Sequence, residues 1–213
     1  MGMDLKEARI QLFKHLNWEI RDKQVISAMA RVPREKFVPP EYYNSAYDDN
    51  PLSIGFGQTI SQPFIVALMI QALELKGDEK VLEVGTGSGY VAAILAELSS
   101  KVITVECIPE LANSASLLLD NLGYQNIEVH LSDDVLGWLN EAPYDAIIVS
   151  AGAPTIPKML LGQLSWGGRL VIPVGSRFEQ KLLKVSRNKE GDTIEDLGAC
   201  YFVPLLGRDA WET

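Results

Sequence analysis

The residues with the clearest chemical meaning surround a glycine-rich turn, GTGSG, at positions 85–89. The turn follows the apolar segment KVLEVG (80–85) and precedes a helical pattern. We therefore expect it at the carboxyl edge of a parallel sheet, where ligands bind. Its glycines would let a ligand approach the backbone, and the start of a helix favours negative groups. The spacing departs from the dinucleotide motif GxGxxG, because the third glycine follows the first by four residues rather than five.

Acidic residues stand at the ends of three expected strands around this turn. Glu83 lies two residues before Gly85, where a carboxylate is unfavourable for a pyrophosphate but suits a cationic ligand. Glu106 follows Gly85 by 21 residues, at the position where a carboxylate accepts ribose hydroxyls, as in NAD sites. Asp133 ends the third strand, where it would meet an adenine amino group. A plain tight turn would explain the glycines alone, but the three acids favour S-adenosylmethionine, which carries a sulfonium, an ammonium and no phosphate.

A serine before an apolar helix is the second candidate for chemistry. Ser61 precedes Gln62-Pro63 and a helical pattern that runs to about Leu75. Serine followed by an early proline is a common helix start, so a simple N-cap is one interpretation. The other is a hydrogen-bond donor to an acceptor substrate. The preceding stretch, 45–62, is long and has no periodicity, and such loops are often functional.

Strands that alternate with helices are expected to position these residues. This alternation after residue 77 predicts an α/β fold with a doubly wound, mostly parallel sheet. Residues 1–77 are expected to form an N-terminal helical and substrate-loop region packed on the core of 78–213, in one structural unit. Further helices are expected at 4–31, 90–98, 109–122 and 156–164. Seven strands are expected, at 80–85, 101–106, 127–133, 144–151, 168–175, 181–188 and 200–207.

Composition excludes several classes of protein. The 213 residues are 47% hydrophobic and 22% charged, which is a globular rather than a disordered composition. A net charge of −9 argues against partners such as nucleic acid or an anionic membrane. Cys107 and Cys200 form no CxxC pair and the only histidines are His15 and His130, so we expect no metal site and no disulfide framework. The N-terminus lacks the apolar core of a signal peptide, and we expect a cytoplasmic monomer.

A family resemblance is carried by segments that follow one another along most of the chain. They are VPREKFVP (32–39), YDDNPLSIGFGQTISQPFIVA (47–67), VLEVGTGSGY (81–90), APYDAIIVSAGAP (142–154), QLSWGGRLVIPVG (163–175) and FVPLLG (202–207). The chain resembles protein-L-isoaspartate O-methyltransferases of the bacterial or archaeal type, and IGFGQTIS is the specific segment. The glycine motif alone would indicate only a class I S-adenosylmethionine-dependent methyltransferase with a Rossmann-like, seven-stranded sheet.

The resemblance implies methyl transfer from S-adenosylmethionine to the free α-carboxylate of L-isoaspartyl residues in proteins and peptides. The ester then collapses to a succinimide, which partly reopens to normal aspartate. Ser61 is the implied active-site residue, in contact with both cofactor and acceptor. Ile54, Ser61 and Val203 are the implied substrate contacts. The implied cofactor-binding residues are Gln58, Thr59, Ile60, Ser61, Glu83, Gly85, Thr86, Gly87, Glu106, Cys107, Asp133 and Asp134.

The chain departs from the family pattern at two places. After the third strand the family commonly has GDGxxG, whereas this chain has SDDVLG (132–137), so that Asp134 stands where glycine is usual. Ser53 stands where proline is frequent.

Three other functions compete with this interpretation. A class I methyltransferase acting on a small-molecule carboxylate would have the same cofactor site. An NAD-dependent oxidoreductase is disfavoured by the glycine spacing and by Glu83. A non-catalytic binding protein on the same fold is disfavoured by the complete set of Ser61, Glu83 and Glu106.

Overall fold

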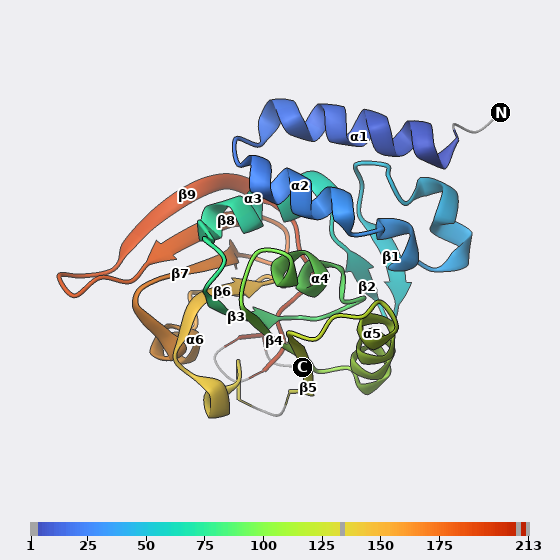
Figure 1. Cartoon of the computed structure of the whole chain (residues 1–213). Helices are drawn as coiled ribbons and strands as arrows, with labels where there is room; N and C mark the ends of the chain where they lie inside the picture. Colours follow the sequence, from blue (N-terminus) through green and yellow to red (C-terminus); the bar gives the residue numbers. More distant parts are fainter. Residues whose placement is uncertain (1–3, 133–134, 208–209, 212–213) are drawn as a thin grey trace.

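A seven-stranded sheet forms the centre of the protein (Figure 1). The computed structural model describes residues 4–132, 135–207 and 210–211. The strand order is β5-β4-β3-β6-β7-β8-β9, parallel from β5 to β7 and antiparallel from β7 to β9. The strands are β3 (Lys80–Val84), β4 (Lys101–Glu106), β5 (Ile127–Leu131), β6 (Tyr144–Val149), β7 (Leu164–Gly175), β8 (Gln180–Ser186) and β9 (Thr193–Cys200). The expected seven-stranded, mostly parallel α/β fold is confirmed.

Two apolar cores lie on opposite faces of this sheet. Successive residues of a strand point to opposite faces, and in β3 Val81 joins the first core while Leu82 joins the second. The first core is covered by α1 (Leu5–Glu19), α2 (Lys23–Arg31), α3 (Pro63–Leu73), α4 (Tyr90–Ala96) and α5 (Pro109–Asn121). The second is covered by α6 (Lys158–Gln163) and irregular segments. Short 3-10 helices span Arg34–Lys36, Pro40–Ser45 and Leu139–Glu141.

The strand order places a switch point beside β3. The chain runs outward from β3 to β4 and β5, then returns to β6 on the other side of β3. The turns that leave β3 and β6 therefore diverge at the carboxyl edge of the sheet, and ligands of open α/β sheets bind in such a crevice. The backbone N–H of Ser150 donates to the Val84 carbonyl (2.8 Å), which joins the two strand ends at this point.

The N-terminal region shares the first core with the sheet. Leu16 of α1, Met29 of α2 and Ile70 of α3 are buried in the same cluster as Ile94 of α4 and Val171 of β7. In Figure 1, α1 and α2 (blue) lie over α3 and α4 on one side of the sheet. The helical pattern expected over 4–31 is broken between α1 and α2.

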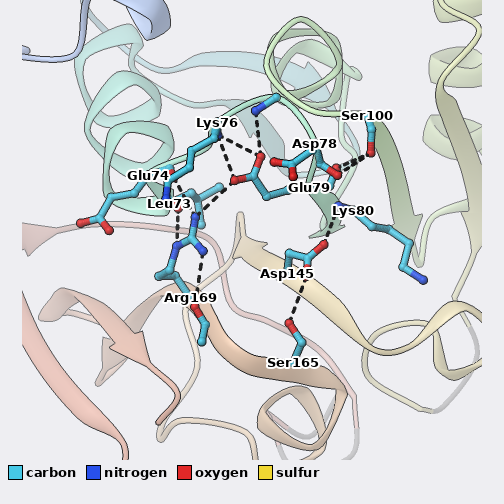
Figure 2. A network of polar contacts seen from close by, with 12 residues as sticks. Leu73, Glu74, Lys76, Asp78, Glu79, Lys80, Ser100, Asp145, Ser165 and Arg169 are labelled. Carbon is cyan, nitrogen blue, oxygen red and sulfur yellow. Dashed lines mark hydrogen bonds and ion pairs between the residues drawn. The ribbon is translucent and has the colours of Figure 1, made fainter.

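Polar contacts bind the end of α3 to the sheet close to residue 77, as Figure 2 shows. The Glu79 carboxylate accepts hydrogen bonds from the backbone N–H groups of Lys76 (2.9 Å) and Gly77 (3.0 Å). Arg169 of β7 donates from Nε to the Leu73 carbonyl (2.6 Å), and its Nη2 lies 3.7 Å from the Glu79 carboxylate. Arg169 therefore satisfies a carbonyl at the end of α3, of the kind that helix C-termini leave unpaired, and Glu79, just before β3, holds the turn that follows the helix.

The last strand of the sheet differs from the sequence prediction. A strand was expected at 200–207, but β9 ends at Cys200. Most side chains of β9 are exposed, so this edge strand lacks the apolar pattern by which strands are recognised. The apolar residues Phe202 and Leu205 are instead buried in an irregular segment that crosses the carboxyl edge of the sheet.

A short hairpin interrupts the segment expected as an irregular loop at 45–62. It consists of β1 (Leu52–Gly55) and β2 (Gln58–Ile60), paired antiparallel and joined through Phe56 and Gly57, both with positive φ. Strands of four and three residues are too short to show alternation in the sequence.

Candidate active site

A cavity of about 490 Å³ opens at the carboxyl ends of β3, β4 and β6. Most of the residues predicted for cofactor binding line it, together with Val203. They are Gln58, Thr59, Ile60, Ser61, Glu83, Gly85, Thr86, Gly87, Glu106 and Cys107. Asp133 and Asp134 lie outside the described residues, while their neighbours Ser132 and Val135 line the cavity.

The glycine turn forms the floor of this cavity. The N–H groups of Gly85 and Thr86 donate to the Val105 carbonyl of β4 (2.9 and 3.2 Å), which anchors the turn. Gly87 has φ +53, and a Cβ added there would lie 3.3 Å from Cδ1 of Ile54. Ile54 is not among the residues that line the cavity; it packs against the turn from the hairpin. The predicted substrate contact at Ile54 would therefore have to be made outside this cavity.

Glu106 holds the glycine turn from the end of β4. Its Oε2 accepts from the N–H of Gly87 (2.8 Å), and its Oε1 accepts from the N–H groups of Cys107 (2.9 Å) and Ile108 (3.1 Å). The side chain is buried, yet it borders the cavity. Three backbone donors fix the carboxylate, whose remaining lone pairs can accept hydroxyl groups of a ligand.

Glu83 is completely buried at the end of β3 and borders the same cavity. Its Oε2 accepts from the Thr104 hydroxyl (2.6 Å), which is in turn 2.6 Å from the Thr86 hydroxyl. No described group donates to its Oε1. Burial raises the pKa of Glu83 to about 8, against the hydrogen bond from Thr104 and with a further increase from the negative charge of Glu106.

Ser61 is not the N-cap of α3, contrary to one of the two sequence interpretations. The capping position is Gln62, and Pro63 is the first helical residue. The Asp49 carboxylate accepts from the N–H of Phe64 (2.8 Å) and from Nε2 of Gln62 (3.0 Å), so it serves as the cap. Within the described part of the chain the Ser61 hydroxyl makes no hydrogen bond, and Ser61 lines the cavity.

A second cavity of about 390 Å³ adjoins the first. Thr59, Ser61, Ser150 and Val203 line both. The other residues of the second cavity are Pro51, Gln62, Ile65, Ala199, Cys200, Tyr201 and Phe202. Ser61 therefore stands where a group bound in one cavity can meet a group bound in the other.

Buried glutamines that the sequence analysis missed hold the walls of these cavities. Gln180 of β8 donates from Nε2 to the Phe202 carbonyl (3.1 Å) and accepts from the Phe202 N–H (2.8 Å). Gln163 accepts from the N–H of Trp138 (2.8 Å) and donates to the Leu136 carbonyl (2.8 Å). A single glutamine in an amphipathic segment carries no periodic signal, so the sequence offered no sign of either role.

The polar groups that line the first cavity fit S-adenosylmethionine. Glu106 presents a fixed carboxylate suited to ribose hydroxyls, and Glu83 presents an oxygen without a donor, suited to a cation. Among the described residues that line the cavity there is no Lys, Arg or His that would receive a phosphate. In the described part of the chain no group of three His, Cys, Asp or Glu side chains could hold a metal ion. No helix among the described residues is long and apolar enough to cross a membrane.

Known proteins resemble this chain over nearly all of its length. The family model for protein-L-isoaspartate(D-aspartate) O-methyltransferase matches residues 7–210. Protein-L-isoaspartate O-methyltransferase 1 of Syntrophobacter fumaroxidans is 53% identical over 193 residues, which are 91% of this chain and 90% of the relative. The Geobacter metallireducens protein-L-isoaspartate O-methyltransferase is 49% identical and covers 100% of this chain and 99% of its own.

A solved structure gives the same answer for the fold. The Plasmodium falciparum relative, in complex with S-adenosyl-L-homocysteine, aligns with a TM-score of 0.80 at 27% identity. The alignment covers 92% of this chain and 96% of that one. The structural resemblance therefore extends over most of both chains.

Proposed function

This chain belongs to the protein-L-isoaspartate O-methyltransferase family, and we propose that its two adjoining cavities are the donor and acceptor sites of that reaction. The enzyme transfers a methyl group from S-adenosylmethionine to the free α-carboxylate of L-isoaspartyl residues in proteins and peptides. The observation that carries the assignment of the two sites is the position of Ser61, which lines both cavities with an unengaged hydroxyl.

Methylation of the acceptor requires little proton transfer by the protein. An α-carboxylate has a pKa of about 3.5, so it is ionised at neutral pH and needs no general base. When bound, S-adenosylmethionine supplies an electrophilic methyl group whose leaving group is a neutral thioether. What the chain must supply is orientation, which can be worth about 7–11 kcal/mol. Ser61 would donate a hydrogen bond to one acceptor oxygen and leave the other free to react.

The roles of the donor-site residues follow from their contacts. Glu106 would accept the ribose hydroxyls, because three backbone donors already fix its orientation. Glu83 would face the charged methionine portion of the cofactor. The strand β2 would form one wall through Gln58, Thr59 and Ile60, and Gly85, Thr86, Gly87 and Cys107 the floor. Asp133 and Asp134 remain proposed adenine-side residues.

The acceptor site is proposed to recognise the peptide backbone. In an isoaspartyl residue the chain continues through the side-chain carbonyl, which frees the α-carboxylate and adds one methylene to the backbone. The hairpin and the segment 199–203 frame the second cavity, and such extended segments can pair with a peptide. Val203 lines both cavities, and Ile54 would act from the hairpin beside the glycine turn. Residues 1–77 would thus contribute the hairpin and Ser61 to both sites, while 78–213 would supply most of the donor site and the segment 199–203 of the acceptor site.

We further propose that the enzyme works as a monomer in the cytoplasm on isoaspartyl proteins. Two free cysteines suit a reducing compartment. A net charge of −9 disfavours contacts with nucleic acid and anionic membranes.

Ligand-dependent thermal stability tests the donor site, and methyl transfer tests the acceptor class. S-adenosylhomocysteine should raise the Tm, because it binds the native state, whereas NAD should not. With a radiolabelled methyl donor, an isoaspartyl peptide should be methylated and free small dicarboxylates should not. Methylation of the small carboxylates but not of the peptide would favour the alternative acceptor class. A Tm increase with NAD alone would contradict the donor site.

A further inference from the structure

We propose that Glu83 binds the ammonium group of the cofactor in exchange for a proton: it is protonated while no cofactor is bound, and it ionises when the ammonium arrives. The inference rests on the proposed function, because it concerns the same donor cavity. It adds a proton to the binding equilibrium, which makes cofactor affinity depend on pH.

The surroundings of Glu83 favour the neutral acid when no cation is present. The side chain is 0% exposed, and its only donor among the described residues is the Thr104 hydroxyl on Oε2. Its Oε1 is buried without a partner. An ionised carboxylate in such a place loses its hydration without replacement, which is far more costly than burying the neutral form. A proton on Oε1 removes that charge.

The charged and titratable groups around Glu83 act in the same direction. From β4, Glu106 adds a negative charge that disfavours a second carboxylate. Thr104 of β4 and Thr86 of the glycine turn contribute only hydroxyls, and Ile148 faces Glu83 in the register with β6. No Lys, Arg or His is among the described residues of the cavity. A cation that ionises Glu83 must therefore come with the ligand.

The ammonium group is the part of the cofactor that suits Oε1. It carries three N–H donors, one of which can satisfy the oxygen that lacks a donor. The sulfonium has a positive charge but no N–H, so it cannot donate a hydrogen bond. S-adenosylhomocysteine keeps the ammonium and lacks the sulfonium, which makes it the appropriate probe.

The exchange is balanced in atoms and charge. The Oε1–H bond of Glu83 breaks, the proton passes to solvent buffer, and the carboxylate forms an ion pair with the ammonium. The hydrogen bond from Thr104 becomes stronger as its acceptor becomes charged. Binding therefore releases one proton at any pH at which Glu83 is protonated beforehand. Because its pKa is about 8, this condition holds below pH 8. Cofactor affinity should rise up to about tenfold per pH unit towards pH 8 and level off near it, and at higher pH it should fall as the ammonium group itself loses its proton.

Calorimetry of S-adenosylhomocysteine binding at pH 7 in buffers of different ionisation enthalpy measures the proton directly. The dependence of the observed enthalpy on the buffer enthalpy should correspond to the release of nearly one proton. 5′-Methylthioadenosine, which lacks the ammonium, should bind with release near zero. This comparison uses the unmodified protein and needs no variant to fold.

Two variants at the site should change this readout in different ways. Glu83→Gln resembles the protonated acid in shape, and it should abolish proton release and flatten the dependence of affinity on pH. Thr104→Val removes the donor to the ionised form, so the pH at which affinity levels off should move upward. Glu79→Gln, the same substitution at a buried glutamate that lines neither cavity, is the matched control and should release the same proton as the unmodified protein.

Two results would overturn the proposal and leave the methyltransferase function intact. One is tight S-adenosylhomocysteine binding with no dependence on buffer enthalpy at pH 7. The other is undiminished proton release in Glu83→Gln. A complete absence of S-adenosylhomocysteine binding would instead overturn the donor site itself, and the proposal with it.

Discussion

The Asp49 carboxylate accepts a 2.8 Å hydrogen bond from the backbone N–H of Phe64, so helix α3 is capped by a residue that precedes the hairpin. Asp49 also accepts a hydrogen bond from Nε2 of Gln62, the residue next to Ser61. This arrangement relieves Ser61 of a structural role and fixes the backbone on its C-terminal side. The proposed catalytic serine and the capping carboxylate can therefore be separated by mutation.

Ser61→Ala should slow methyl transfer about 10- to 150-fold, because the loss of a hydrogen bond to a charged group costs about 1.5–3 kcal/mol. Cofactor affinity and Tm should change little, since the hydroxyl caps no helix. Steady-state kinetics and a melting curve measure both. A lower Tm with intact turnover would show that the hydroxyl is structural after all.

Asp49→Ala, unlike Ser61→Ala, should affect stability more than turnover. Loss of an N-cap typically costs about 1 kcal/mol, which corresponds to a Tm lower by about 2–4 °C in a protein of this size. The start of α3 should also loosen, so KM for the acceptor peptide should rise. Asp49→Asn keeps an acceptor oxygen for the Phe64 N–H and should recover most of the Tm. Equal Tm values for Asp49→Ala and the unmodified protein would contradict the cap.

Glu106→Ala should weaken S-adenosylhomocysteine binding by about 1.5–3 kcal/mol through loss of the proposed ribose contact. Because Glu106 also accepts three backbone N–H groups, Tm should fall as well. Glu106→Gln keeps one oxygen and separates the effects: Tm should be largely restored while affinity stays reduced. Unchanged affinity in both variants, measured by calorimetry, would remove Glu106 from the site.

Glu79 should make stability depend on pH at the junction of α3 and the sheet. Burial opposes its ionisation, but the N–H donors of Lys76 and Gly77, with help from Arg169, hold its pKa below the ordinary value of 4.5. A depressed pKa means that Glu79 stabilises the fold above the ordinary value and that this contribution is lost as pH falls through the folded-state pKa. Glu79→Gln should therefore lower Tm at pH 7 and make less difference near pH 3. An equal deficit at both pH values would show that charge is not the cause.

The strand-end acids could be predicted from the sequence because their position depends only on local order. Glu83 and Glu106 lie at the ends of apolar strands, and parallel strands bring these ends to one edge of the sheet. The cap of α3 could not, since Asp49 lies 15 residues before Phe64 and reaches it only after the hairpin folds. The same holds for Gln180, whose partner Phe202 is 22 residues away.

The wrong prediction of a strand at 200–207 also arises because a local pattern does not show the tertiary surroundings. An apolar run predicts a strand only where the apolar residues are buried in the sheet. β9 is an exposed edge strand and has no such run. The apolar residues after Cys200 line the second cavity and do not pair in the sheet. The hydrogen-bond chain from Thr86 through Thr104 to the buried Glu83 carboxylate was also beyond the sequence, because it joins two strands and the glycine turn.

Methyl transfer to a matched pair of peptides, identical except for an isoaspartyl or an aspartyl linkage, tests the central claim most directly. With a radiolabelled methyl donor, the unmodified protein should label the isoaspartyl peptide and leave its aspartyl twin unlabelled. Ser61→Ala should retain that preference at a rate about 10- to 150-fold lower. Equal labelling of the two peptides, or labelling of neither by a protein that binds S-adenosylhomocysteine, would contradict the account.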